Sequence, residues 1–163
     1  MKASRFFLSI DLGVFNTILF MYQLNYHSKS VSELELNQLE HILETANVVN
    51  ANKDVSGCLV YYNSSFVQIL EGNKKDVLDV FEKIKTDNRH HSITLLWENY
   101  VDKRYFNKWS MAFHSPEDQF STQFVNNLLM LSSFSEKNSG SLRSFWGHVR
   151  RVLESDSNQN IEA

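Results

Sequence analysis

The segment SSFVQILEG, residues 64–72, places the tightest limit on how this chain can fold. Its apolar side chains form an almost unbroken run of strand length: Phe66, Val67, Ile69 and Leu70. Because successive side chains of a strand point to opposite faces, such a run predicts a sheet covered on both faces. Gln68 interrupts the run, and a buried amide without hydrogen-bond partners costs about 1–3 kcal/mol. The fold must therefore supply Gln68 with specific partners.

Apolar periodicity and turn residues divide the rest of the chain into alternating strands and helices. Strands are expected at 21–27, 57–62, 65–72, 92–101 and 109–113. Helices are expected from a capping box of Ser32 and Glu35 to about residue 49, from Asn73 to Ile84, from a Ser115 cap with Pro116 in the first turn, and over 142–155. The two strands on either side of Asn63-Ser64 should form a hairpin.

The order of these elements, βαββαββ followed by two helices, predicts the α+β class. We expect a ferredoxin-like mixed sheet with two crossover helices on one face and two C-terminal helices on the other. The second helical layer would complete the cover that the 64–72 segment requires.

Length and composition indicate one domain of 163 residues with a disordered tail at 156–163. Residues 1–20 are expected to be an N-terminal extension of uncertain status, since Asp11, Gly13 and Asn16 interrupt its apolar run and disfavour a membrane span. Residues 21–114 would form the main domain and 115–155 a helical cap. A single cysteine suits the reducing cytoplasm, and a net charge of −3 gives no reason to expect nucleic acid.

Several polar or bulky residues occur in apolar surroundings at a distinctive spacing: Tyr26 in NYHS, Asn50 in VNANKDVSG, Gln68 in FVQILEG, Trp109 and Met111 in WSM, and Asp87, Arg89 and His90 in DNRH. Taken singly, each has an ordinary structural explanation such as core packing or helix capping. As an ordered set from about residue 21 to 114, they resemble the BLUF family of blue-light sensors. No histidine or cysteine spacing typical of a zinc site is present, so no metal is expected.

The resemblance implies a non-covalently bound flavin, usually FAD, with FMN or riboflavin as alternatives, between the two crossover helices. By position, Ile42 and Ile84 would sandwich its ring and Asn50 would bind the polar edge. Contacts with the ribityl chain or phosphates would come from Lys83, Asp87, Arg89 and His90. Lys83 stands where relatives often have arginine, so a bidentate contact would become a point charge.

The resemblance also implies a photocycle carried by Tyr26 and Gln68. A phenol beside an excited flavin can supply an electron and a proton, and an amide offers a donor at one end and an acceptor at the other. Reversal or tautomerisation of Gln68 would therefore switch the hydrogen bonds between Tyr26 and the flavin. Trp109 and Met111, expected on one face of the fifth strand, would relay this change to the C-terminal helices.

The signal would pass to a separate signalling protein or transcriptional regulator, or act through self-association, with no membrane or direct nucleic-acid partner. The surface around Phe145 and Trp146 is one candidate for this contact, and simple capping of the sheet is the other explanation for these residues. A flavin-dependent redox enzyme using the same pocket is the main functional alternative. A domain that has lost its flavin is a third, disfavoured by the intact set of Tyr26, Asn50 and Gln68.

Overall fold

A computed structural model of the chain describes residues 21–131 and 139–159. Its strands are β1 (Met21–Ser30), β2 (Ser56–Tyr62), β3 (Ser65–Gly72), β4 (His90–Val101) and β5 (Ala112–His114). Its helices are α1 (Leu36–Ala51), α2 (Lys74–Lys85), α3 (Gln119–Leu131) and α4 (Ser139–Gln159). The expected order of strands and helices is confirmed, and residues 1–20 and 160–163 lie outside the described part.

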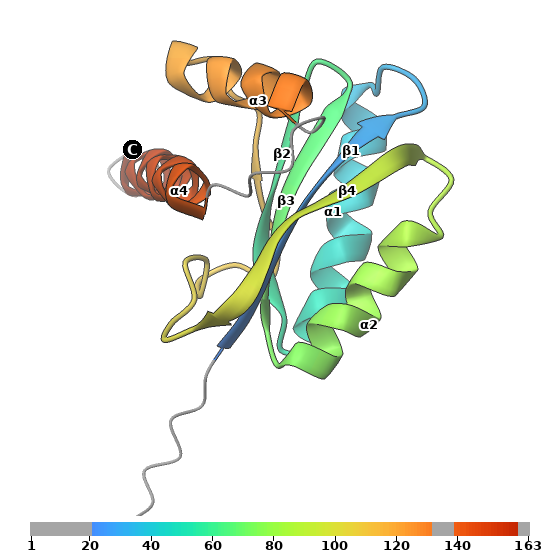
Figure 1. Cartoon of the computed structure of the whole chain (residues 1–163), viewed down its shortest axis with the longest axis vertical. Helices are drawn as coiled ribbons and strands as arrows, with labels where there is room; N and C mark the ends of the chain where they lie inside the picture. The colour runs from blue at the N-terminus through green and yellow to red at the C-terminus, as the bar shows by residue number, and fades with distance from the viewer. Residues whose placement is uncertain (1–20, 132–138, 160–163) are drawn as a thin grey trace, which may run out of the picture.

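The five strands form one mixed sheet in the order β4-β1-β3-β2-β5. β1 pairs antiparallel with both β3 and β4, whereas β5 runs parallel to β2. Helices α1 and α2 cover one face of the sheet, and α3 and α4 lie on the other (Figure 1). The α+β class and the two-sided cover are therefore as expected.

Each face of the sheet has its own hydrophobic core. On the α1/α2 side it includes Tyr26, Phe66 and Leu70, and on the α3/α4 side it includes Val67 and Ile69. Alternate residues of β3 thus enter different cores, and all eight residues of the strand are buried. This arrangement explains the continuous apolar run in the sequence.

The β2–β3 hairpin turns at Asn63 and Ser64, whose φ angles are 49° and 51°. Two successive positive φ angles are typical of the tight turns whose twist matches that of paired strands. In β2, Gly57 lies so close to β3 that an added Cβ would stand 2.1 Å from the carbonyl oxygen of Ile69. No side chain fits there without displacing backbone.

Several element boundaries differ from the expected ones. The capping box of α1 is formed by Glu35 and Gln38, not by Ser32 and Glu35. Helix α3 begins at Gln119 rather than at the Ser115-Pro116 pair, because Asp118 accepts the hydrogen bond of the Ser121 N–H and so caps the first turn. Each of these two segments contains several residues that can cap a helix, so the sequence pattern alone selected the wrong capping residue.

The C-terminal helix α4 caps the sheet through a bond that sequence patterns do not reveal. Phe145 and Trp146 are buried, and the indole N–H of Trp146 donates to Oδ1 of Asn25 on β1 over 2.6 Å. These two side chains are therefore not exposed for contact with a partner, and the structure supports the explanation that they cap the sheet. The helix continues to Gln159, so residues 156–159, expected in a disordered tail, are helical.

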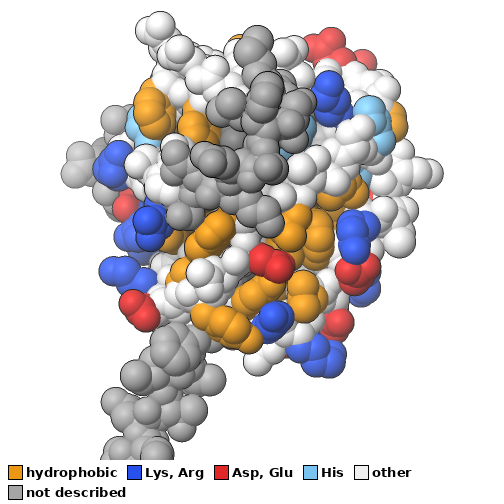
Figure 2. Space-filling model, viewed as in Figure 1, with side chains coloured by type: hydrophobic (Ala, Val, Ile, Leu, Met, Phe, Trp, Pro, Cys, Tyr) orange, Lys and Arg blue, Asp and Glu red, His pale blue; other side chains and the backbone are white. Residues whose placement is uncertain are grey.

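β4 is an edge strand of the sheet, and it lies at the front of the molecule in Figure 1. From the same side, Figure 2 shows hydrophobic side chains interspersed with charged ones. Tyr100 is 52% exposed, and Nζ of Lys74 on α2 lies 5.6 Å from the centroid of its ring.

No helix within residues 21–131 and 139–159 has the length and apolar character needed to cross a membrane. In the same ranges, no cluster of three or more histidine, cysteine or acidic side chains is arranged to hold a metal ion.

The close packing of Gly57 and the open surroundings of Gly147 predict opposite effects of alanine on stability. Gly57→Ala should lower the free energy of unfolding by at least about 2 kcal/mol, because the new methyl group overlaps the backbone of β3. Gly147→Ala in α4 should raise it by about 0.5–1 kcal/mol, since its nearest contact is a flexible arginine end at 3.8 Å and alanine favours helix. Chemical denaturation measures both. Equal effects in the two variants would contradict the packing assigned to Gly57.

Candidate flavin-binding site

A cavity of about 210 Å³ lies against the α1/α2 face of the sheet. It is lined by all nine residues expected to carry the photocycle and hold the flavin: Tyr26, Ile42, Asn50, Gln68, Lys83, Ile84, Asp87, Arg89 and His90. They come from β1, α1, β3, α2, the loop after α2 and the start of β4, so only the folded chain brings them together.

Tyr26 and Gln68 form the buried polar centre of this cavity. They are direct partners across the antiparallel β1–β3 pair, and the Tyr26 hydroxyl donates to Oε1 of Gln68. The two residues are only 3% and 5% exposed. Burial, reinforced by the negative charge of Asp87, raises the pKa of the Tyr26 phenol far above its ordinary value. The phenol therefore stays neutral and able to donate.

The other end of the Gln68 amide points to Met111. Nε2 of Gln68 donates to the sulfur of Met111 over 3.5 Å, a contact with a weak acceptor. The amide thus has one strong and one weak partner within the protein. A glutamine is thus accommodated in a core strand because its amide bonds Tyr26 and Met111 and faces the cavity.

Asn50, in the last turn of α1, is 1% exposed and lines the cavity. Its Nδ2 donates to the carbonyl oxygen of Ser110 over 2.9 Å. One turn earlier, Oδ1 of Asn47 accepts the N–H of Met111, also over 2.9 Å. Sequence analysis missed Asn47, although its spacing of three residues from Asn50 puts both on one side of the helix.

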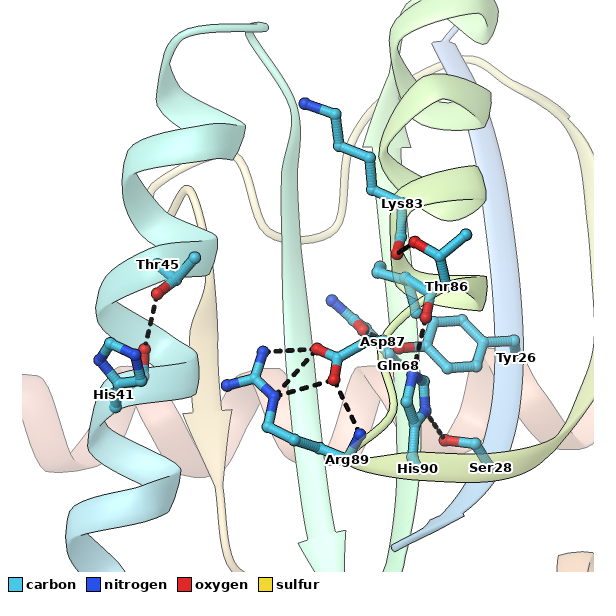
Figure 3. Close-up of polar contacts among 11 residues, drawn as sticks. Tyr26, Ser28, His41, Thr45, Gln68, Lys83, Thr86, Asp87, Arg89 and His90 are labelled. Carbon is cyan, nitrogen blue, oxygen red and sulfur yellow. Dashed lines mark hydrogen bonds and ion pairs between the residues drawn. The ribbon is translucent and has the colours of Figure 1, made fainter.

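Asp87 and Arg89 pair with each other beside the cavity (Figure 3). Nε of Arg89 lies 2.9 and 3.0 Å from the two carboxylate oxygens of Asp87. The guanidinium hydrogen bond holds the pKa of Asp87 below its ordinary value, so the carboxylate stays ionised. The arginine charge is therefore already balanced inside the protein.

His90 has partners for both ring nitrogens (Figure 3). Nε2 lies 2.8 Å from the carbonyl oxygen of Ile84, and Nδ1 lies 2.7 Å from the hydroxyl of Ser28. A carbonyl only accepts, so Nε2 carries a proton. His90 thereby ties the end of α2 to β1, and its ring centroid lies 6.5 Å from that of Tyr26.

The remaining lining fits a flat aromatic ligand with an anionic tail. Ile42 from α1 and Ile84 from α2 offer apolar walls from two helices. Lys83 has an exposed side chain at the cavity, and among the described residues it forms no ion pair. An unbalanced cation beside an apolar cavity suits a phosphate. The residues present are therefore compatible with a flavin nucleotide.

The expected placement of Trp109 and Met111 is wrong in part. β5 begins only at Ala112, so both residues precede the strand instead of lying within it. Met111 packs in the core on the α1/α2 side, while Trp109 packs against the core on the α3/α4 side, where its ring lies 6.3 Å from that of Phe106. Their side chains therefore lie on opposite sides of the sheet, and only Met111 contacts Gln68.

Glu71 is a second buried group that sequence analysis did not single out. It is fully buried and accepts from Nε2 of Gln23 and from the N–H groups of Tyr105 and Phe106, over 2.6, 2.7 and 2.8 Å. Burial raises the pKa of this carboxyl group, and the hydrogen bonds oppose the shift. An acidic residue within an apolar strand segment could have identified Glu71 from the sequence. Glu71 anchors the segment that leads to Met111.

The sheet, its two helical layers and the cavity with a buried Tyr–Gln pair define an α+β ligand-binding domain. The family model for sensors of blue light using FAD, BLUF, matches residues 21–112. The chain belongs to the BLUF family. The expected family is thus confirmed, the cofactor named in its description is FAD, and that description is of a sensor rather than an enzyme.

Individual relatives are similar over the same region. The chain is 30% identical over 95 residues to photoactivated adenylate cyclase subunit beta of Euglena gracilis, covering 58% of this chain and 11% of the relative. It is 33% identical over 86 residues to the blue light- and temperature-regulated antirepressor BluF of Escherichia coli (strain K12), covering 53% of this chain and 21% of that one. The match thus spans about a tenth to a fifth of these curated relatives.

Solved structures share the fold. BlsA in its photo-activated state superposes with a TM-score of 0.68 at 30% identity, over 80% of this chain and 94% of that chain. The BlsA ground state gives 0.69, also at 30% identity, over 80% and 87%.

The environment of Tyr26 leads to a titration prediction. Its hydroxyl should remain protonated well above pH 10.0, the ordinary pKa, while the protein is folded. Because the folded pKa exceeds the unfolded one, the associated stability is complete below pH 10.0 and is lost as the pH rises through the folded pKa. Tyrosinate absorbance of wild type minus Tyr26→Phe should show no ionisation step near pH 10.0 before unfolding. A reversible step there would contradict the burial assigned to Tyr26.

Proposed function

We propose that this chain binds FAD in the cavity between α1 and α2 and signals blue light through a change in the hydrogen bonds of Gln68. The observation that carries the proposal is the buried Tyr26–Gln68 bond in the wall of a cavity that suits a flavin. Within the described residues, the further partner of this pair is a thioether, a weak acceptor, so the amide of Gln68 can change its hydrogen bonds at low cost in bonds lost within the protein.

Binding would divide among the lining residues according to their chemistry. Ile42 and Ile84 would contact the ring, Asn50 its polar edge, and Lys83 the anionic tail. Asp87 and Arg89 would act as a neutral pair whose polar atoms face the ribityl chain or phosphates. His90 would serve mainly to hold α2 and β1 in place, because both of its ring nitrogens are engaged.

Bound FAD would supply absorption of blue light and, when excited, an oxidant beside the phenol. The phenol of Tyr26 could then give up an electron and a proton and take both back, with no net oxidation. Tyr26 is suited to be that phenol, since it is neutral, buried and hydrogen-bonded. Gln68 would accept from Tyr26 in one state and present the other end of its amide in the second. This change would break the contact between Nε2 of Gln68 and the Met111 sulfur, so the position of Met111 bears on it.

For the output, the proposal gives Met111 and Trp109 separate roles. Met111 contacts Gln68, while Trp109 packs against the core that α4 covers, so a shift of the segment joining them would reach the C-terminal helices. The recipient would be a separate protein, such as a signalling protein or a transcriptional regulator, or a second copy of this chain. Support comes from the relatives, among which are a light-regulated antirepressor and a photoactivated cyclase.

The test is an absorption spectrum of the purified protein in darkness and under blue light. Wild type should show oxidised-flavin bands that shift slightly to the red and recover in the dark. Gln68→Leu should bind FAD but lose the shift, and Tyr26→Phe should also block it. Tyr22→Phe is the matched control: this tyrosine is buried on the same strand, donates to Glu98 over 2.6 Å and lies outside the cavity lining, so its variant should respond as wild type does.

Two results would count against the proposal. A normal photocycle in Gln68→Leu would refute the role given to its amide. Bands that bleach under illumination, instead of shifting, would indicate reduction of the flavin and favour a redox enzyme.

A further inference from the structure

A single peptide group, the one joining Ser110 and Met111, is held at both ends by α1. Its carbonyl oxygen, on Ser110, accepts from Nδ2 of Asn50 over 2.9 Å. Its N–H, on Met111, donates to Oδ1 of Asn47 over 2.9 Å. Since a peptide group is planar and rigid, two bonds at opposite ends fix the orientation of the whole plane.

The sheet holds the neighbouring peptide, since the N–H of Gly57 on β2 donates to the carbonyl oxygen of Trp109 over 3.4 Å, but it does not hold the N–H of Met111. The pairing of β5 with β2 starts at Ala112 opposite Cys58, one residue after Met111. The N–H of Met111 thus depends on a side chain for its hydrogen bond. Asn47 is itself held in place, because its Nδ2 donates to the carbonyl oxygen of Leu43 over 3.0 Å.

The clamped peptide leads directly to the Tyr26–Gln68 pair. Met111 begins at the clamped N–H, and its sulfur accepts from Nε2 of Gln68, whose Oε1 accepts from Tyr26. A continuous series of contacts thus connects Asn47, outside the cavity lining, to the phenol inside it.

We propose that Asn47 is a positioning residue of the photocycle: it orients the Ser110–Met111 peptide, so that the Met111 sulfur limits the rotation of the Gln68 amide. The proposal rests on the function proposed above. Without the acceptor at position 47, Met111 would move more freely, and Gln68 would pass more easily between its two arrangements. The dark state would then return faster after illumination.

Two variants separate the acceptor from the rest of the side chain. Asn47→Leu and Asn47→Asp have nearly the size of asparagine, and both lose the bond to Leu43. Only Asn47→Asp keeps an oxygen that can accept the Met111 N–H. Asn47→Ala removes the acceptor with less bulk and replaces the leucine variant if thermal unfolding shows that the latter is not folded.

The first measurement is the rate of dark recovery. Asn47→Leu should recover about fivefold faster than wild type, the factor that corresponds to one neutral hydrogen bond. Asn47→Asp should recover at close to the wild-type rate. Equal rates in Asn47→Leu and wild type, or equal acceleration in the leucine and aspartate variants, would overturn the proposal.

The second measurement needs no light. The protein contains four methionines, so the ¹³C-methyl signal of Met111 can be assigned in the protein as purified by comparison with Met111→Leu. This signal should shift or broaden in Asn47→Leu and keep its position in Asn47→Asp. If wild type shows no light-induced shift, the proposed function fails, and the methyl spectrum still decides whether Asn47 positions Met111.

Discussion

The central strands β1 and β3 are buried on both faces, and the rest of the structure follows from this constraint. Alternate residues of each strand must therefore pack against the α1/α2 layer on one face and the α3/α4 layer on the other. On one side Tyr26 and Gln68 form a cross-strand pair in the cavity wall. On the other side Asn25 accepts from Trp146 and Glu71 accepts from Tyr105 and Phe106. The same two strands therefore build the site and anchor both the α4 helix and the segment before β5.

Three polar side chains, those of Asn47, Asn50 and Glu71, fix a segment that lacks regular secondary structure. In the stretch between β4 and β5, Trp109 forms backbone hydrogen bonds with Gly57 and Phe106, and side chains bond several of the other backbone groups. Glu71 takes two of its N–H groups, while Asn47 and Asn50 take both ends of a third peptide. Since unpaired buried backbone groups are costly, these side chains determine the path of the segment, and with it the position of Met111.

Sequence patterns predicted the elements whose signal is local. The hairpin at Asn63-Ser64 and the α2 start at Asn73 depend on turn and cap chemistry within a few residues, and both are confirmed. The starts of α1 and α3 were wrong because neighbouring residues offered competing caps. The fifth strand was placed too early, since WSMAF has strand-like residues throughout, whereas the ladder with β2 begins only at Ala112.

The sequence by itself determined the layered α+β class and the need for cover on both sheet faces, because alternation along a strand and the order of elements are properties of the chain itself. The nine residues that line the cavity followed from the resemblance of its motifs to those of the BLUF family, not from local patterns. Only the tertiary structure decided which groups meet: that Gln68 lies between Tyr26 and Met111, that Trp109 and Met111 lie on opposite sides of the sheet, and that Asn47 clamps a distant peptide. Such pairings join residues far apart in sequence, and they depend on strand register and helix orientation, which no local pattern encodes.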